Sequence, residues 1–193
     1  MLTDRQCFFC ATLMYGVSLV YSVFLWRKGF RKDDRINYVL LLAGFTMHTV
    51  AMFMRGFSFN RCPVNNLFEA TMFVNWSAVG AYLILGLWPK IRSLGAFASP
   101  IFVFLGIYAL MPGLDHHDPD GEMTKNGIVS LHAVLILISY AGFGLCAVAS
   151  CMYLLQERNL KKHNIFAVTS VLPPIQRLGS VAGILLVASL MLV

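Results

Sequence analysis

The stretch from Val129 to Leu155 reads VSLHAVLILISYAGFGLCAVASCMYLL and contains no Asp, Glu, Lys or Arg. It is longer than the roughly 20 apolar residues that a helix needs to cross the hydrocarbon core of a bilayer. Backbone polar groups in lipid must be satisfied within their own segment, so a helix is the expected conformation. This stretch therefore predicts an integral membrane protein.

Five further apolar blocks surround it, at roughly Cys7–Trp26, Ile36–Arg55, Glu69–Trp88, Phe97–Pro112 and Leu178–Val193. The chain is 58% hydrophobic and 12% charged, whereas soluble domains carry roughly 25% charged residues. We therefore expect an all-α fold, a polytopic integral membrane helix bundle of about six transmembrane helices. We expect one membrane domain over residues 1–193, with the lipid bilayer as its surroundings.

The basic residues indicate the orientation of the chain. Eleven of the 15 Lys and Arg residues follow the first, third and fifth blocks, and four lie on the other side. Positive loops stay inside, so the N-terminus is predicted to be outside. Because these charges are scattered over short loops and form no single exposed face, we expect no nucleic-acid partner despite the net charge of +6.

The last block ends at Val193 without a polar flank. Its length is about 24 Å as a helix, which is less than the ~30 Å core of a bilayer. We therefore expect the sequence to be a fragment of a longer protein or the product of a truncated gene.

The outer loop after the second block is the most informative segment. Pro63 favours an extended chain before it, and Asn65 or Asn66 can cap the next helix. Glu69 then lies in the first helical turn, where a carboxylate favours the positive end of the helix dipole. Glu69 is expected to stand alone, with no second carboxylate beside it. Local physics requires no more than a well-capped helix start.

His132 lies about one turn inside the outer end of the fifth block. An ionisable residue in a membrane span marks a functional site by default. Neutral imidazole is a standard axial ligand of haem iron. On a helix, Ile136, Ser139 and Phe143 share its stripe. The alternative is a histidine that bonds a neighbouring helix or faces interfacial water.

Other candidate ligands are weaker. His48 lies deep in the second block and could contact haem in transit or form a packing hydrogen bond. His116 and His117 lie in an acidic outer loop that could hold a metal ion, although a solvated loop is the better interpretation. Cys7 and Cys10 form a CxxC pattern for which packing is favoured over redox chemistry.

Two segments resemble the cytochrome c assembly proteins, of the CcsA/ResC type and their HemX-like relatives. Residues 63–76 (PVNNLFEATMFVNW) are similar to the Pro-x-x-Asn-Leu-x-Glu-x-x-x-Phe-x-x-Trp signature. This places in register Pro63, Asn66, Leu67, Glu69, Phe73 and Trp76. Residues 132–143 resemble the family's His-Val-x-x-x-x-x-Ser-Tyr-Ala-x-Phe helix, with Ala133 in place of Val.

The resemblance implies a membrane component of cytochrome c biogenesis that handles b-type haem in transit at the outer face of the bacterial inner membrane. The implied partners are apocytochrome c and a subunit with a large external domain. His132 would ligate the haem iron, and the implied cofactor-binding residues are His132, His48, Pro63, Asn66, Glu69, Trp76, Ser139 and Tyr140. The chain would be at most part of a haem-attachment system, without a catalytic residue of its own.

The family's tryptophan-rich outer loop and second external histidine have no counterpart in this sequence. In the family's order they follow the last block seen here. The alternative function is therefore that of a HemX-like protein, which regulates or scaffolds haem synthesis or respiratory-complex assembly without attachment activity.

Overall fold

The computed structural model describes residues 3–27, 35–59, 62–89, 91–116, 127–161 and 173–193. These ranges form helices and no strand: α1 (Asp4–Arg27), α2 (Arg35–Phe59), α3 (Leu67–Leu85), α4 (Leu94–Ala109), α5 (Gly127–Lys161) and α6 (Ile175–Leu192). By length and composition, five of them could cross a membrane. The predicted all-α membrane bundle is confirmed.

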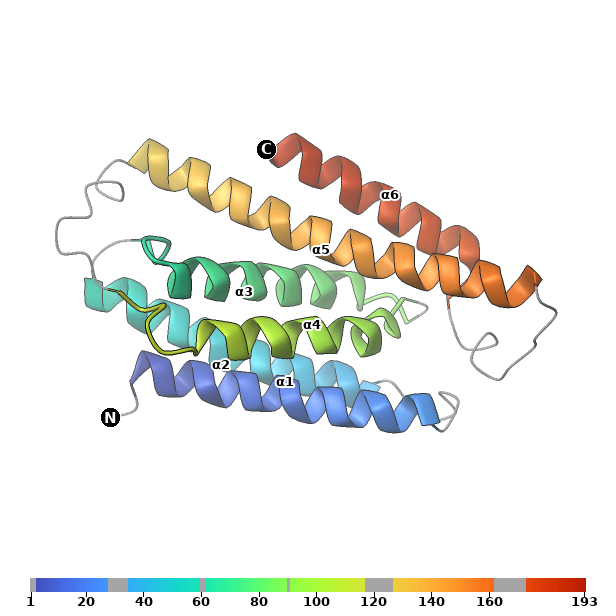
Figure 1. The fold of residues 1–193 in the computed structure, drawn as a ribbon, viewed down its shortest axis with the longest axis horizontal. Coiled ribbons are helices and arrows are strands. Elements are labelled where there is room, and N and C mark those ends of the chain that lie inside the picture. The colour runs from blue at the N-terminus through green and yellow to red at the C-terminus, as the bar shows by residue number, and fades with distance from the viewer. Residues whose placement is uncertain (1–2, 28–34, 60–61, 90, 117–126, 162–172) are drawn as a thin grey trace.

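The helices form a layered bundle (Figure 1). α1 packs along α2 and α4, and α3 lies between α4 and α5. α6 packs along α5 on the outside of the bundle, away from α1 and α2. The main core contains the fully buried side chains of Tyr15, Tyr82, Phe102, Leu145 and Met152. Large aromatic and aliphatic residues from different helices thus hold the centre together.

The helices differ from the predicted blocks in position at α4 and in length at α5. α4 has 16 residues with Pro100 inside it, which gives about 24 Å and is short of the ~30 Å core. It begins three residues earlier than predicted, after the turns that follow α3. α5 has 35 residues, about 52 Å, and so extends beyond the thickness of the hydrocarbon core.

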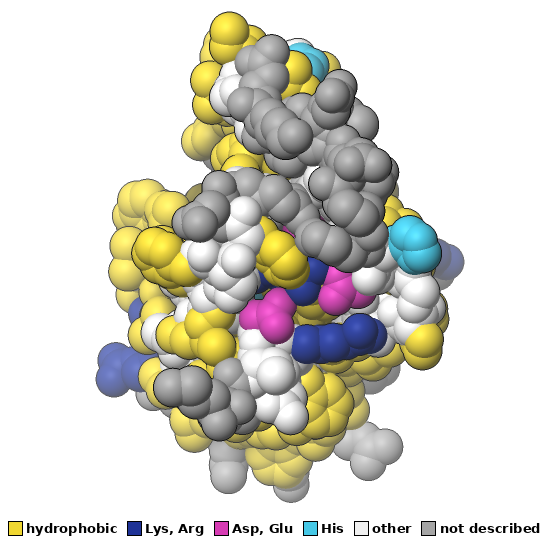
Figure 2. All heavy atoms as spheres, turned by 90° about the vertical axis from the view of Figure 1, so that its left-hand side faces the viewer, with side chains coloured by type: hydrophobic (Ala, Val, Ile, Leu, Met, Phe, Trp, Pro, Cys, Tyr) yellow, Lys and Arg dark blue, Asp and Glu magenta, His cyan; other side chains and the backbone are white. Residues whose placement is uncertain are grey.

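One end of the bundle brings together the starts of α1, α3 and α5 with the ends of α2 and α4, at the left of Figure 1. This is the end that the basic loops predict to face outward. In an end-on view, acidic and basic side chains gather in the middle of this face beside hydrophobic ones (Figure 2). We call it the outer end below.

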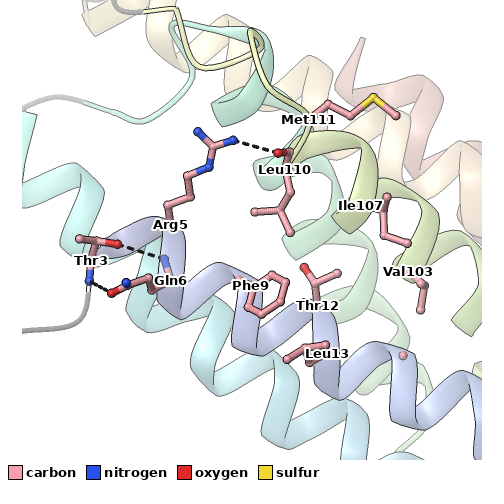
Figure 3. A pocket seen from close by; sticks show the side chains of 11 residues that line it. Thr3, Arg5, Gln6, Phe9, Thr12, Leu13, Val103, Ile107, Leu110 and Met111 are labelled. Carbon is pink, nitrogen blue, oxygen red and sulfur yellow. Dashed lines mark hydrogen bonds between the residues drawn. The ribbon is translucent and has the colours of Figure 1, made fainter.

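The start of α1 is fixed by a capping box. The Thr3 hydroxyl accepts a hydrogen bond from the Gln6 N–H at 3.2 Å, and the Gln6 side-chain oxygen accepts one from the Thr3 N–H at 3.0 Å (Figure 3). Such reciprocal bonds satisfy backbone donors that the first helical turn leaves open. The box therefore sets Asp4 and Arg5 in the first turn of α1 at the outer end.

Small residues allow α5 and α6 to approach. A Cβ atom at Gly142 would overlap the Ser189 hydroxyl of α6. Close backbone approach at small residues is the usual way in which membrane helices gain van der Waals contact. The Cys146 thiol also contacts the Ala182 carbonyl at 3.3 Å. These contacts join α6 to the middle of α5.

Candidate functional site

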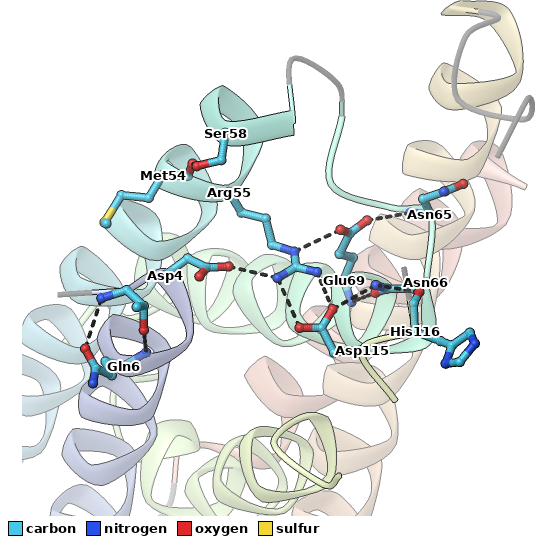
Figure 4. Close-up of polar contacts among 11 residues, drawn as sticks. Asp4, Gln6, Met54, Arg55, Ser58, Asn65, Asn66, Glu69, Asp115 and His116 are labelled. Atoms are coloured by element: carbon cyan, nitrogen blue, oxygen red, sulfur yellow. Dashed lines mark hydrogen bonds and ion pairs between the residues drawn. The ribbon is translucent and has the colours of Figure 1, made fainter. Parts of the chain in front are cut away.

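A buried arginine organises the outer end. Arg55, near the end of α2, is 4% exposed, and its guanidinium group lies among three carboxylates (Figure 4). Its Nε donates to Glu69 Oε1 at 2.8 Å, and its Nη1 donates to Asp4 Oδ2 at 2.8 Å. Nη1 also donates to Asp115 Oδ2 at 3.3 Å, and Nη2 pairs with Asp115 Oδ1. We call Asp4, Arg55, Glu69 and Asp115 the Arg55 cluster.

The Arg55 cluster ties four separate parts of the chain together. Asp4 comes from α1, Glu69 from the first turn of α3, and Asp115 from the segment after α4. The Arg55 guanidinium carbon also lies 4.8 Å from the centre of the Phe68 ring. Buried charges keep their place only when they are paired and hydrogen-bonded. The cluster therefore fixes the relative positions of these helix ends.

The signature segment 63–69 folds onto this cluster. The Asn66 side-chain oxygen caps α3 by accepting from the Glu69 N–H at 2.7 Å, and its Nδ2 donates to Asp115 Oδ1 at 3.0 Å. The Asn65 N–H donates to Glu69 Oε2 at 2.8 Å. Of the two predicted capping residues, Asn66 is the cap. Both Glu69 oxygens are thus engaged in protein hydrogen bonds.

The expectation that Glu69 stands alone is wrong. It is fully buried and shares Arg55 with Asp4 and Asp115. Sequence reasoning missed the pairing because Arg55 is separated from these partners by 14, 51 and 60 positions. The available signal was the arginine at the end of an apolar block, since a charge in a span requires a partner.

A groove between α2 and α3 lies beside the cluster. It has a volume of about 490 Å³ and is lined by Thr49, Met52, Phe53, Gly56, Phe57, Pro63, Phe73 and Trp76. The Trp76 indole N–H donates to the Thr49 hydroxyl at 2.9 Å, and the Phe45 ring stacks on the indole with 5.4 Å between centroids. Two predicted site residues, Pro63 and Trp76, therefore meet in one aromatic groove, the α2–α3 groove.

The predicted residues on α5 are dispersed. His132 is exposed, and its imidazole has no hydrogen-bond partner among the described residues. Ser139, two turns further along the same helical face, is fully buried, and its hydroxyl also has no partner within the described ranges. Tyr140 points away from the core and is 58% exposed. The face that carries His132 is thus packed at Ser139 and open at His132.

His48 lies apart from this site, deep in α2. Its side chain is fully buried, with Nδ1 3.1 Å from the Tyr15 hydroxyl and its ring centroid 4.8 Å from that of Phe8. These are the contacts of the packing histidine that the sequence allowed. A haem-binding role for His48 stays a prediction.

The other candidate ligands do not converge in the described part of the chain. There, no group of three or more His, Cys, Asp or Glu side chains could hold a metal ion. His117 and the acidic residues after it lie outside the described residues, while Asp115 belongs to the Arg55 cluster. Cys7 and Cys10 are both free thiols, and Cys7 packs against the Met54 sulfur at 3.8 Å.

The part of the chain from α3 onward matches a known family. Residues 64–193 match the model of the cytochrome C assembly protein family, which includes the Asn66–Glu69 segment and His132. The match covers more than half of the chain. This protein belongs to the cytochrome c assembly protein family. Together with its long apolar helices, this membership identifies a multi-pass membrane protein.

Individual relatives are similar along most of the chain. It is 26% identical over 170 residues to Protein HemX of Brevibacillus brevis, a match that covers 88% of this chain and 62% of the relative. It is 24% identical to Protein HemX of Bacillus subtilis (strain 168), in a match that covers 78% of this chain and 55% of that relative. It is 25% identical to the cytochrome c biogenesis protein CcsA of Pyropia yezoensis, in a match that covers 80% of this chain and 49% of that relative. The chain therefore spans about half to three fifths of the length of these relatives.

The Arg55 cluster joins two parts that the family match separates. Glu69 and Asp115 lie inside the matched region, whereas Asp4 and Arg55 precede it. The Glu69 carboxylate of the signature segment thus pairs with Arg55, which lies on a helix outside the matched residues.

Proposed function

We propose that this protein is a membrane component of cytochrome c biogenesis, which handles or delivers haem at the outer face of the bacterial inner membrane for attachment to apocytochrome c. One observation carries the proposal. His132 lies exposed near the start of α5, on the face that is buried two turns later, and no described residue engages its imidazole. Neutral imidazole is a standard axial ligand of haem iron.

The α2–α3 groove supports the same proposal. Pro63, Phe73 and Trp76 provide an apolar, aromatic wall of the kind against which a porphyrin packs. A neighbouring groove of about 520 Å³ shares Trp76 and is bordered by Ile138, which lies between His132 and the middle of α5. The aromatic wall and the α5 helix thus border one another near Trp76.

The buried Arg55 cluster and the exposed His132 would have different roles. The Arg55 cluster would hold the signature segment in place, and His132 would ligate the metal. When haem is bound, its vinyl groups and the thiols of the substrate supply the thioether chemistry. The chain itself would contribute position, axial ligation and shelter from water, with a partner subunit that carries a large external domain.

A haem titration tests this role. The purified chain is loaded with haem in detergent, and its visible spectrum is compared with that of His132→Ala. His116→Ala is the matched control, because His116 is another exposed histidine at the outer end. We expect His132→Ala to change the Soret position and to weaken haem retention, and His116→Ala to leave both unchanged. Identical spectra for all three proteins would defeat the assignment of His132.

A HemX-like role without attachment activity is the second candidate. Two HemX relatives, which match 88% and 78% of this chain, support it, and the CcsA relative, which matches 80%, supports the first role. Expression in cells that lack their own cytochrome c assembly protein separates the two roles. Restored covalent haem staining of c-type cytochromes would support the first role, and its absence despite a His132-dependent haem spectrum would support the second.

A further inference from the structure

A second groove opens on the opposite side of the outer end, between α1 and α4. Its volume is about 740 Å³, and side chains that line it are drawn in Figure 3. Phe9, Leu13 and Gly16 border it along α1, and Val103 and Ile107 border it along α4. Phe9 and Leu13 are each 51% exposed and Ile107 is 54% exposed. The long side of this α1–α4 groove is therefore accessible from the surrounding lipid.

Among the described residues that line the α1–α4 groove, Arg5 is the only one with a charged side chain. It lies at the outer end, where its Nη2 donates to the Leu110 carbonyl at 2.8 Å (Figure 3). The neighbouring Asp4 is directed to Arg55 in the cluster and does not neutralise it there. Within the described ranges, the other N–H groups of Arg5 have no hydrogen-bond acceptor. They remain able to donate to an anion.

The length of the groove matches one leaflet of a bilayer. Arg5 and Gly16 are eleven positions apart on α1, which corresponds to about 16 Å along a helix. Half of the ~30 Å hydrocarbon core is about 15 Å. A molecule with its anionic group at Arg5 would therefore place an extended chain down to the middle of the membrane. Such dimensions fit an acyl chain better than a compact ring.

We propose that the α1–α4 groove binds one anionic phospholipid. Its phosphate would accept hydrogen bonds from Arg5, since arginine donors and phosphate oxygens form strong charge-assisted bonds. One acyl chain would lie between α1 and α4 as far as Gly16. There, an added Cβ would meet no atom within 4 Å, so space remains for the end of the chain. This site contains none of the proposed haem-binding residues and does not depend on them.

Native mass spectrometry of the whole chain in detergent tests the proposal, with phosphatidylglycerol and phosphatidylcholine as probes. Gly16→Leu would fill the groove without a backbone clash and with a better helix former. Gly183→Leu is the matched control, because a Cβ at this α6 glycine also meets nothing within 4 Å. Arg5→Gln removes the charge, and Arg158→Gln on α5 is its control.

We expect one phosphatidylglycerol to bind each chain more tightly than phosphatidylcholine. Arg5→Gln should weaken phosphatidylglycerol binding about tenfold, the scale of one charge-assisted hydrogen bond. Gly16→Leu should also weaken it, because the leucine side chain occupies the space for the acyl chain. The two control variants should bind as the parent does. Equal binding by Gly16→Leu and Gly183→Leu, or no preference for the anionic lipid, would overturn the proposal. The proposal would also be overturned if Gly16→Leu and Arg5→Gln lost haem binding but still bound phosphatidylglycerol as the parent does.

Discussion

Two regions at the outer end of this protein are built in opposite ways. In the Arg55 cluster, the Arg55 guanidinium group and the completely buried Glu69 carboxylate are both engaged by other protein groups. Near the start of α5, His132 is exposed and has no hydrogen-bond partner among the described residues. Polar groups that already bond one another are unavailable to a ligand. The comparison indicates that the cluster positions the outer end, whereas His132 is available for binding.

Removing the central cation should have the largest effect on stability. Arg55→Met leaves the buried Glu69 carboxylate without its cation, and unpaired buried charges cost about 3–5 kcal/mol. The free energy of unfolding in mixed detergent micelles measures the loss. The double variant Arg55→Met with Glu69→Leu should recover part of it, because the buried carboxylate is then gone. A single variant as stable as the parent would contradict a fixing role for the cluster.

A smaller loss is expected when Glu69 alone is neutralised. Glu69→Gln keeps one acceptor oxygen, which can serve either Arg55 or the Asn65 N–H but not both, while Asp4 and Asp115 still pair with the guanidinium group. The loss of a charged hydrogen bond should reduce the free energy of unfolding by about 1.5–3 kcal/mol. The same micelle titration provides the measurement. A loss larger than that of Arg55→Met would mean that Glu69, rather than Arg55, is the centre of the cluster.

The side-chain cap of α3 should contribute less to stability than Arg55 or Glu69. Asn66→Ala removes the acceptor of the Glu69 N–H, which should cost about 1 kcal/mol of stability. It also removes the Nδ2 donor to Asp115. Asn65→Ala is the matched control, because Asn65 takes part through its backbone N–H only. Melting temperatures of both variants test the difference. Equal shifts would show that side-chain capping does not stabilise the signature segment.

Substitution at the open region should barely affect stability. His132→Leu replaces an exposed side chain without partners in the described structure, so the free energy of unfolding should stay within about 0.5 kcal/mol of the parent value. Haem retention by the same variant should nevertheless fall. A large loss of stability would show that His132 is a packing residue, and the contrast between the two regions would then disappear.

The sequence predicted the elements better than their contacts. Long apolar blocks locate the helices, because the bilayer constrains the length and hydrophobicity of each helix separately. A cap at Asn65 or Asn66 was also predictable, since the bond joins residues only three positions apart, and Asn66 is the residue that forms it. The Arg55 cluster was not, because its partners come from helices far apart in the chain. The exposure of His132 could not be predicted either, since it depends on where the neighbouring helices end.

The reduction potential of the bound haem tests the central claim most directly. Methionine in place of histidine as an axial ligand raises this potential. The account predicts that His132→Met raises the midpoint potential of haem bound to the purified protein, while His116→Met leaves it at the parent value. The same potential in all three proteins would contradict ligation by His132.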